Sequence, residues 1–551
     1  MSRFYNKADL IGGRPVFLLE IAWGGVSYYF GSEAVQLDSS DRIIEYTPDL
    51  LDFQFMESAD FNDINLEANL LSCAVIFPDT INILQEWARG NFIENAKANF
   101  SYVIIKDGSV VNTYDDRIIL FNGTVQEPIV GDPDELDNFV ALSVELDPVD
   151  QNIKLLDPAL VIDTRFASRD TETAEGKAWP LIFGLPGYTI SVTGQSNSLK
   201  AMPAYCIKRY SVGVDAEFLI STGTIENTQV TIQDSNFQVV TKTVETAADT
   251  DNNIYSFISV ANTDGLDLPG YFREGSTNEW WISYNPANGG GMLSPYTEGS
   301  LSGAGDICRY VLSRLNVNID DGAWANLSAL LNKYQFAGYV NDSTVGAYEW
   351  LVGNILSYLP ITIISGPDGL KPILNQLAYI GTLDPVMSIT LDADSEFEQL
   401  DAIETMNSSS DLTNRITIKY AKNGLNQEYT HQIRVTDVAE KLTDIESIYS
   451  INSINKYGVQ PETIETDYIY DTSTAQAIGL DIVRQRSVLQ RRFSIVGPFQ
   501  YGNLQIGDIL QLSSNRLYLN KVKMMIVEKE WTSTQWRFSL LFEENSVINQ
   551  G

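Results

Sequence analysis

The 551-residue chain contains one histidine, His431, and this limits the acid–base and metal chemistry open to it. A serine–histidine–aspartate triad could use only this residue, and a site with several histidine ligands is excluded. His431 lies in residues 428–435, where polar and apolar side chains roughly alternate as in a half-exposed strand. We therefore interpret it as a surface strand residue and not as a catalytic one.

Two acidic segments contain the residue types of a calcium site. Asp249, Asp251 and Asn253 have the opening spacing of a calcium-binding loop. Such a loop needs a glycine at its sixth position and a glutamate at its end, but the chain has Ile254 and Val260 there. We interpret this segment as a solvated turn and expect no bound metal. The same interpretation applies to a second acidic turn, formed by Asp132, Asp134, Glu135 and Asp137.

Trp280, Trp281 and Tyr284 are the aromatic residues best suited to binding, because they follow two polar residues, Asn278 and Glu279. Aromatic rings on a polar loop can stack on sugar rings or anchor a protein partner. The alternative is that they form the small core of their own domain. They are candidate contacts for a partner or a glycan.

Arg484, Arg486, Arg491 and Arg492 form the densest basic group of the sequence. We expect one amphipathic helix over residues 472–492, so the group would lie toward its C-terminus, where cations favour the helix dipole. The alternative is a contact with an acidic patch on a neighbouring subunit.

No phosphate-binding glycine loop, dinucleotide fingerprint or metalloprotease signature occurs in the sequence. A large chain with several β domains and no concentrated chemistry is expected to be an assembly or binding protein. We therefore expect no enzymatic activity and no cofactor.

Residues 304–374 have apolar residues at the spacing of amphipathic helices. The acidic, aromatic and arginine segments described above lie before and after this region. The spacing predicts three helices, the second capped by Asp321 and the third ending before Pro360, because proline cannot continue a helix. A strand at residues 361–364 and a turn at 366–369 should follow. We interpret this region as a compact α/β block, a helical waist between two β regions.

Alternating apolar residues predict short strands on both sides of this block. Residues 17–30 should form a hairpin about Gly24–Gly25, since glycine supplies the positive φ of such turns. Residues 100–114 should form another about Asp107–Gly108. In the last strand, the side chains of residues 536, 538, 540 and 542 should share one face. The expected fold class is mainly β with an α/β middle region.

The sequence divides into four expected domains. Residues 1–190 form a first β-barrel domain with its exit segment, and residues 205–294 an inserted small β domain. Residues 301–395 form the α/β middle domain, and residues 396–551 a second β-barrel domain with a packed helix.

The charge balance is unusual, since 72 acidic and 36 basic residues give a formal net charge of −36. Such a surface repels phosphate and disfavours anionic membranes, so a nucleic-acid reader is not expected. Cys73, Cys206 and Cys308 form no CxxC pair, which argues against a disulfide framework or a cysteine-built zinc site. The N-terminus lacks the apolar core of a secretion signal, and no apolar run reaches the length of a membrane span. We expect a soluble chain without a membrane anchor, made in a cytoplasm.

Three segments in this order have a counterpart in a known family. They are residues 161–163 with 179–184 (WPLIFG), residues 305–307 through 336–338 to 368–370, and residues 504–509 (LQIGDI). In order and spacing they resemble the hub proteins at the distal tip of bacteriophage tails, a family related to contractile-tail baseplate hubs. The resemblance covers most of residues 1–190 and 301–551.

This resemblance implies a homotrimer in which two similar β-barrel hub domains per chain form a ring of pseudo-sixfold symmetry. The ring would adapt the sixfold tail, with its distal tail protein ring, to a threefold fibre or spike protein. The middle region would narrow the channel and contact the tape-measure protein, and DNA would pass without specific binding. The protein would be located in the virion at the tail tip after synthesis in the host cytoplasm.

The sequence departs from the family in two places. Residues 205–294 have no counterpart that can be placed, and the chain ends soon after the second barrel without a fused lysozyme or receptor-binding segment. The alternative from another class is a carbohydrate-binding or glycan-degrading multi-domain β protein, with Trp280, Trp281 and Tyr284 as its platform.

Overall fold

The computed structural model describes the protein as a mainly β chain. No helix among the described residues is long and apolar enough to cross a membrane. The described residues are 13–50, 52–59, 72–78, 83–126, 129–130, 139–145, 153–156, ten short strands between 181 and 284, 302–315, 317–340, 342–366, 368–375, 384–392, 395–422, 428–532 and 534–543.

The chain opens with an antiparallel hairpin of β1 (Arg14–Trp23) and β2 (Val26–Gly31). Gly24 and Gly25 occupy the turn with φ values of +60° and +80°. Positive φ at both central residues is what a two-residue turn needs to match the twist of its strands. The hairpin predicted from the sequence is confirmed.

The opening module is completed by antiparallel strands in the order β2-β1-β7-β9-β11-β6-β5. β8 folds back on β7 across Asp107 and Gly108, which both have positive φ, so the turn of the second predicted hairpin is confirmed. Its return strand is shorter than predicted, since it ends at Val110 and not at Tyr114. The bounds are β7 (Lys97–Lys106), β8 (Ser109–Val110), β9 (Ile118–Val125), β11 (Phe139–Glu145), β6 (Ser72–Pro78) and β5 (Asp52–Ser58). Smaller elements of this module are β3 (Val35–Asp38), β4 (Ile43–Tyr46), α2 (Ile83–Ala88) and β10 (Ile129–Val130).

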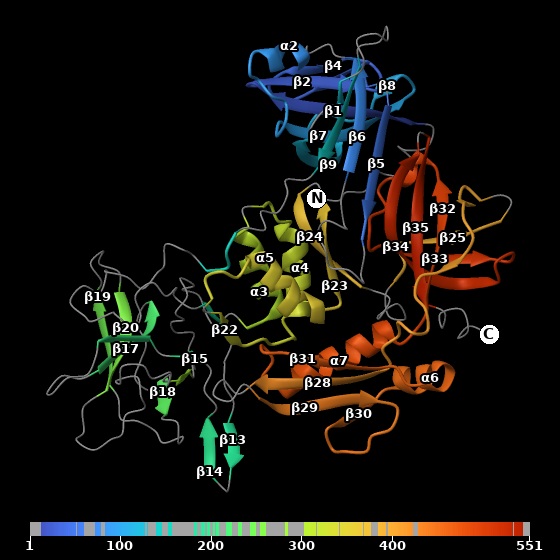
Figure 1. The fold of residues 1–551 in the computed structure, drawn as a ribbon. Helices are drawn as coiled ribbons and strands as arrows, with labels where there is room; N and C mark the ends of the chain where they lie inside the picture. Colours follow the sequence, from blue (N-terminus) through green and yellow to red (C-terminus); the bar gives the residue numbers. More distant parts are fainter. Residues whose placement is uncertain are drawn as a thin grey trace.

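The opening module shares its sheet with the closing strands of the chain (Figure 1). β5 pairs antiparallel with β34 (Leu519–Thr532), and the sheet continues through β35 (Gln535–Glu543) and β32 (Gln490–Gly497). Side chains of both modules lie in one hydrophobic core, which includes residues 536, 538, 540 and 542, as the sequence predicts. The two predicted β regions are therefore two parts of one sheet. The remaining closing strands are β25 (Met387–Thr390), β26 (Glu398–Gln399), β27 (Glu404–Thr405) and β33 (Ile509–Ser514), with a short 3-10 helix at Phe499–Tyr501.

The α/β block contains the helices that the sequence predicts. The cap of the second helix is Asp320 and not Asp321, since the Asp320 carboxylate accepts the N–H of Ala323 at 2.9 Å. Asp321 already belongs to the first turn, where it pairs with Arg309 at 3.0 Å. The elements are α3 (Ala304–Ser313), α4 (Asp321–Leu331), β22 (Gly338–Val340), α5 (Ala347–Asn354), a 3-10 turn at Leu356–Tyr358, β23 (Ile361–Gly366) and β24 (Gly369–Leu374).

Residues 415–486 form a second small sheet with two helices, which we call the lobe (Figure 1). Its strand order is β30-β29-β28-β31, and Gly479 of α7 packs directly on Val435 and Ile418 of the sheet. The strands are β28 (Arg415–Lys422), β29 (Tyr429–Thr436), β30 (Asp444–Glu446) and β31 (Pro461–Glu465), and the helices are α6 (Ile448–Tyr457) and α7 (Thr472–Arg486).

The single helix expected over residues 472–492 is wrong at its C-terminal end. α7 ends at Arg486 with Ser487 as its C-cap, and residues 490–497 form β32. β32 pairs with β35 along eight consecutive residues, so the sheet ladder overrides the local helical pattern.

The lobe and the α/β block share a second hydrophobic core. Leu312, Trp324 and Leu351 of the block lie in the same buried cluster as Ile418 and Ile482 of the lobe. The domain boundaries at 190, 205–294, 301–395 and 396–551 stay a prediction. The cores group the described residues differently, because the lobe packs with the block and the closing strands pack with the opening module.

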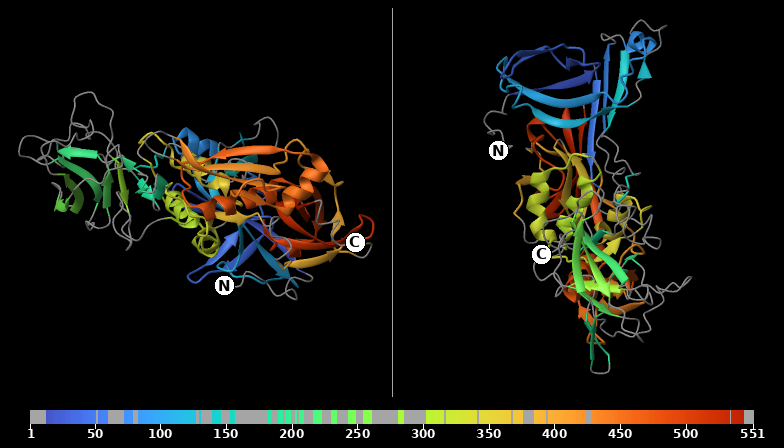
Figure 2. Two further views of the ribbon diagram at one scale, coloured as in Figure 1. Left: turned by 90° about the horizontal axis from the view of Figure 1, so that it is seen from below. Right: turned by 90° about the vertical axis from the view of Figure 1, so that its left-hand side faces the viewer.

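Short strands precede and occupy the expected insertion, residues 205–294. β12, which precedes it, belongs to the second core through Phe183, whereas the strands of residues 205–294 lie to one side of both cores (Figures 1 and 2). β12 pairs with β22 and fixes Phe183 against Trp350 and Tyr468, with ring centroids 5.5 Å from each. Two small sheets follow, with the orders β15-β21-β18 and β16-β17-β20-β19. The bounds are β12 (Leu181–Phe183), β13 (Thr189–Val192), β14 (Gln195–Ser198), β15 (Met202–Pro203), β16 (Tyr205–Lys208), β17 (Ala216–Thr222), β18 (Val230–Gln233), β19 (Thr243–Ala248), β20 (Ile254–Val260) and β21 (Trp281–Tyr284).

The β23–β24 turn depends on Gly369, and replacing it by alanine is expected to destabilise the protein by more than about 1 kcal/mol. Gly369 has a φ of +115°, and a Cβ there would lie 2.4 Å from the backbone oxygen of Asn318. That oxygen accepts the N–H of Leu370 at 2.8 Å, so the strand cannot move away without losing the bond. Urea unfolding measures the change. The matched control is Gly353→Ala on α5, where a Cβ meets nothing within 4 Å and a stabilisation of about 0.5–1 kcal/mol is expected.

Candidate interaction site

Of the three aromatic residues singled out from the sequence, two are on strand β21. Trp280 is outside the described residues, and Trp281 and Tyr284 are the first and last residues of β21. Trp281 lies opposite Gln233 and Tyr284 opposite Val230 in the register with β18. Their contact with a glycan or a partner stays a prediction.

The four arginines singled out from the sequence do not lie on one helix. Arg484 and Arg486 are in the last turn of α7, as a favourable helix dipole requires, whereas Arg491 and Arg492 are on β32. The guanidinium of Arg484 lies 5.1 Å from the ring centroid of Tyr449, and Arg486 pairs with Glu462 at 3.5 Å. Arg492 pairs with Glu528 and donates to Ser539 at 3.0 Å. A subunit contact at these residues stays a prediction.

His431 lies on β29, as expected, with its Nδ1 3.0 Å from Thr430 Oγ1 and its ring 5.6 Å from that of Tyr420. Cys308 is fully buried in α3, and this burial raises the pKa of its thiol. In the described part of the chain, no three His, Cys, Asp or Glu side chains gather as a metal site would need. The two acidic turns at 132–137 and 249–253 lie outside the described residues.

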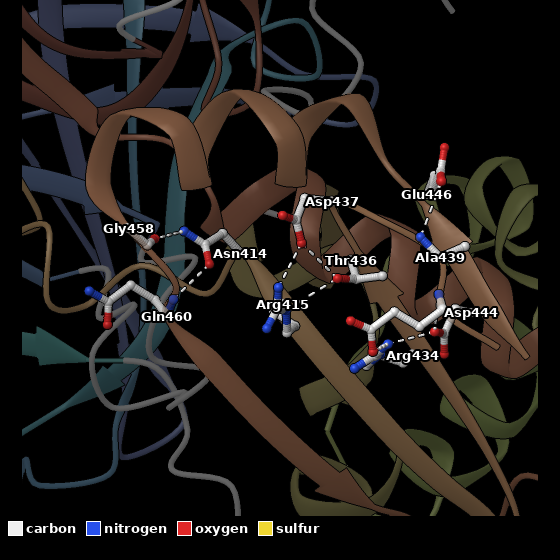
Figure 3. Close-up of polar contacts among 11 residues, drawn as sticks. Asn414, Arg415, Arg434, Thr436, Asp437, Ala439, Asp444, Glu446, Gly458 and Gln460 are labelled. Carbon is white, nitrogen blue, oxygen red and sulfur yellow. Dashed lines mark hydrogen bonds and ion pairs between the residues drawn. The ribbon is translucent and has the colours of Figure 1, made fainter.

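The most connected polar cluster of the lobe is built on two arginines from neighbouring strands (Figure 3). Arg415 on β28 donates from Nε to Thr436 Oγ1 at 3.1 Å and from Nη2 to Asp437 Oδ1 at 2.7 Å. Arg434 on β29 donates from Nη2 to Asp444 Oδ2 at 2.6 Å and to Glu440 Oε2 at 2.9 Å. The charged groups pair inside the chain, so the cluster holds backbone segments together.

The segment held by this cluster is the loop from Asp437 to Thr443, which joins β29 to β30. Asp444 Oδ2 also accepts the N–H groups of Glu440 and Lys441, each at 2.9 Å, and Glu446 Oε1 accepts the N–H of Ala439 at 3.1 Å (Figure 3). The hydrogen bond from Arg434 and these backbone N–H groups lower the pKa of the Asp444 carboxyl to about 2. The loop is therefore fixed at several backbone positions while Asp444 is ionised.

This fixed loop presents apolar side chains to solvent. Leu442 is fully exposed, and Val438 and Ile448 are 59% and 60% exposed. Ile448 follows Ser447, whose N–H bonds the carbonyl of Thr436 at 3.0 Å, so the start of α6 lies beside the start of the loop. Exposed apolar side chains on a loop fixed in this way suit an interaction surface.

At the same end of the sheet, next to Arg415, lies Asn414, a fully buried side chain (Figure 3). Its Nδ2 donates to the carbonyl of Gly458 at 2.8 Å and to Ser453 Oγ at 3.1 Å. Its Oδ1 accepts the N–H of Gln460 at 2.7 Å. These bonds fix α6 to the sheet, so the helix that carries Ile448 is held at both ends.

A second group of charges lies inside the protein, where the opening module, the α/β block and the closing module meet. Lys371 Nζ is 3.6 Å from Glu57 Oε1, and Lys529 Nζ donates to the carbonyl of Gly502 at 2.5 Å. Lys529 Nζ also lies 4.5 Å from the ring centroid of Trp536. We call this group the junction cluster; it consists of Glu57 on β5, Lys371 on β24, Asp508 before β33 and Lys529 on β34.

Burial sets the protonation of the junction cluster. It lowers the pKa of Lys529 to about 8, against the opposing attraction of Glu57 and Asp508. It raises the pKa of the Asp508 carboxyl, which accepts the N–H of Gln505 at 2.8 Å. Each charge is stabilised chiefly by the others, because little solvent reaches them.

Sequence reasoning missed both the loop and the junction cluster. A signal for the loop was present, since Val438 and Leu442 are apolar residues in an otherwise polar segment between two strands. No local signal marks the junction cluster, because its members are far apart in the chain.

Comparison with known proteins gives matches only at the level of structure. No protein-family model and no curated protein matches the chain. One similar structure is the tail protein from Neisseria meningitidis MC58, at TM-score 0.38 and 8% identity, over 96% of this chain and 97% of that chain. Another is the 43 kDa tail protein of prophage MuSo2 from Shewanella oneidensis, at TM-score 0.37 and 11% identity, over 97% of this chain and 99% of that chain. A third is a chain in the virion of the native gene transfer agent particle, at TM-score 0.37 and 11% identity, over 69% of this chain and 87% of that chain.

Proposed function

We propose that this chain is a structural hub protein of a bacteriophage tail tip and not an enzyme. Three copies would form a ring that adapts a sixfold tail to a threefold fibre or spike. The observation that carries the proposal is the shared sheet, in which β5 joins the opening module to β34 of the closing module around one core. A ring with two β modules per chain needs those modules at a fixed angle, and a common sheet and core provide that rigidity.

The charge and the resemblance in segment order suggest the partners. The ring would bind a distal tail protein ring on one side and a fibre or spike on the other, with the tape-measure protein in its channel. A net charge of −36 would let DNA pass without binding, since phosphates are repelled by carboxylates. Location at the tail tip in the virion follows from the same proposal.

The mass of the purified full-length chain in solution tests this function. We expect light scattering to give three times the chain mass of 61.3 kDa, and electron microscopy to show threefold rings. A glycan array is the second measurement, with heat-denatured protein as its control. A monomer that binds one glycan tightly would overturn the hub function in favour of a carbohydrate-binding protein.

A further inference from the structure

The loop from Asp437 to Thr443 holds Leu442 in a fixed and fully exposed position. Its backbone is fixed by carboxylates of Asp444 and Glu446, and its flanking strand is tied by Arg434. Displaying a leucine at full exposure has no benefit for folding, because burial of that side chain would stabilise the fold. A fixed loop also loses little conformational freedom on binding, which favours a tight contact.

The position of the loop leaves it accessible to another molecule. It lies at the end of the lobe away from the opening module in two views (Figures 1 and 2). Leu442, Val438 and Ile448 are all more than half exposed, so no other described part of the chain covers them. Val438 and Leu442 are on the loop and Ile448 is at the start of α6, and Glu440 of the same loop pairs with Arg434 of β29.

The charge of the lobe indicates what this surface binds. Residues 415–486 contain eight basic and ten acidic residues, against 36 and 72 in the whole chain. Basic side chains of the lobe are in ion pairs within it, among them those of Arg415, Lys419, Lys422, Arg434 and Arg486. Two copies of a chain with a net charge of −36 repel each other, so a contact between copies is least opposed where charges balance.

We propose that Leu442, with Val438 and Ile448, is the central contact by which one copy of this chain binds the next. This inference rests on the proposed ring and names the surface that closes it. In a ring of three the contact is heterologous, so the loop of one copy inserts into a different surface of its neighbour. Leu442 would be the main apolar contact with the neighbouring copy. The nearly balanced charge of the lobe would limit the electrostatic repulsion between the two copies.

The test uses the full-length chain and three variants. In Leu442→Glu, a carboxylate would have to enter the apolar contact, so the trimer should dissociate at least about tenfold more readily. Light scattering and sedimentation over a dilution series measure this shift. The matched control is Ile43→Glu, which adds a carboxylate at a residue 61% exposed on β4 and should keep the wild-type mass. Leu442→Met keeps an apolar side chain and should also remain trimeric.

The outcomes separate this inference from the function on which it rests. Since Leu442 is fully exposed, we expect all variants to keep the wild-type far-UV circular dichroism spectrum, which checks that each one still folds. If the wild type and Leu442→Glu are both trimeric, the loop is not the contact between copies, while the ring proposal stands. Loss of binding to a separate tail protein in that still trimeric variant would assign the loop to that partner instead. A wild type that is monomeric at every concentration would overturn both proposals.

Discussion

Replacing Lys529 by methionine is expected to lower the free energy of unfolding by about 1–3 kcal/mol. Methionine fills a similar volume, so the change removes the charge and one donor and creates little cavity. Glu57 and Asp508 would remain buried with only Lys371 to balance them, and the carbonyl of Gly502 would lose its bond from Nζ. The cost is that of a buried carbonyl left without its donor, since burial already disfavours the charge of Lys529 itself.

The pH dependence of the same variant tests whether burial lowers the pKa of Lys529 in the folded protein. Because the pKa of Lys529 is about 8 in the folded protein, below its value near 10.4 in the unfolded chain, the native state releases this proton first. The unfolded state then binds more protons between about pH 8 and 10, so Lys529 makes wild-type stability rise with pH there. In Lys529→Met this contribution is absent.

Guanidinium unfolding of both proteins from pH 7 to pH 10 measures the two effects. The difference in stability between wild type and variant should grow from pH 8 to pH 10. Lys521→Met removes an exposed lysine of the same strand and should change stability by less than about 0.5 kcal/mol. A constant difference over this range would show that burial does not lower the pKa of Lys529 in the folded protein.

The sequence predicts the elements whose signals are local. The hairpin at Gly24 and Gly25 was predictable because two glycines between alternating strands allow one turn geometry. The helices of the α/β block were predictable because their apolar spacing repeats within a few turns. The cap at Asp320 was missed by one residue, since two adjacent aspartates have the same propensity and only the backbone conformation decides between them.

Features that depend on contacts between distant segments were not predictable in the same way. The pairing of β5 with β34 joins residues more than 450 positions apart, and neither strand contains a residue that specifies its partner. The end of α7 at Arg486 depends on the ladder that β32 forms with β35. The candidate site has the same limit, because the exposure of Leu442 follows from how Asp444 and Arg434 hold the loop.

Replacing Trp324 by alanine should destabilise the second core by about 3–5 kcal/mol. Trp324 is fully buried, and its Nε1 donates to the carbonyl of Leu370 at 3.1 Å. The change leaves a cavity between α4 and β24 and leaves a buried carbonyl without that donor. Trp324→Phe keeps most of the ring and loses mainly the hydrogen bond, so it should cost less than half as much.

This second prediction also tests how the two cores are coupled. On β23, Ile363 lies in the core of the block and Ile364 in the core of the shared sheet, because neighbouring residues of a strand face opposite sides. A cavity at Trp324 should therefore lower the calorimetric melting temperature of the whole protein if that strand transmits the strain. A melt that splits into two transitions, with only the first one lowered, would show that the cores unfold independently. In that case the shared sheet alone, and not the block, would keep the two β modules of each chain at a fixed angle.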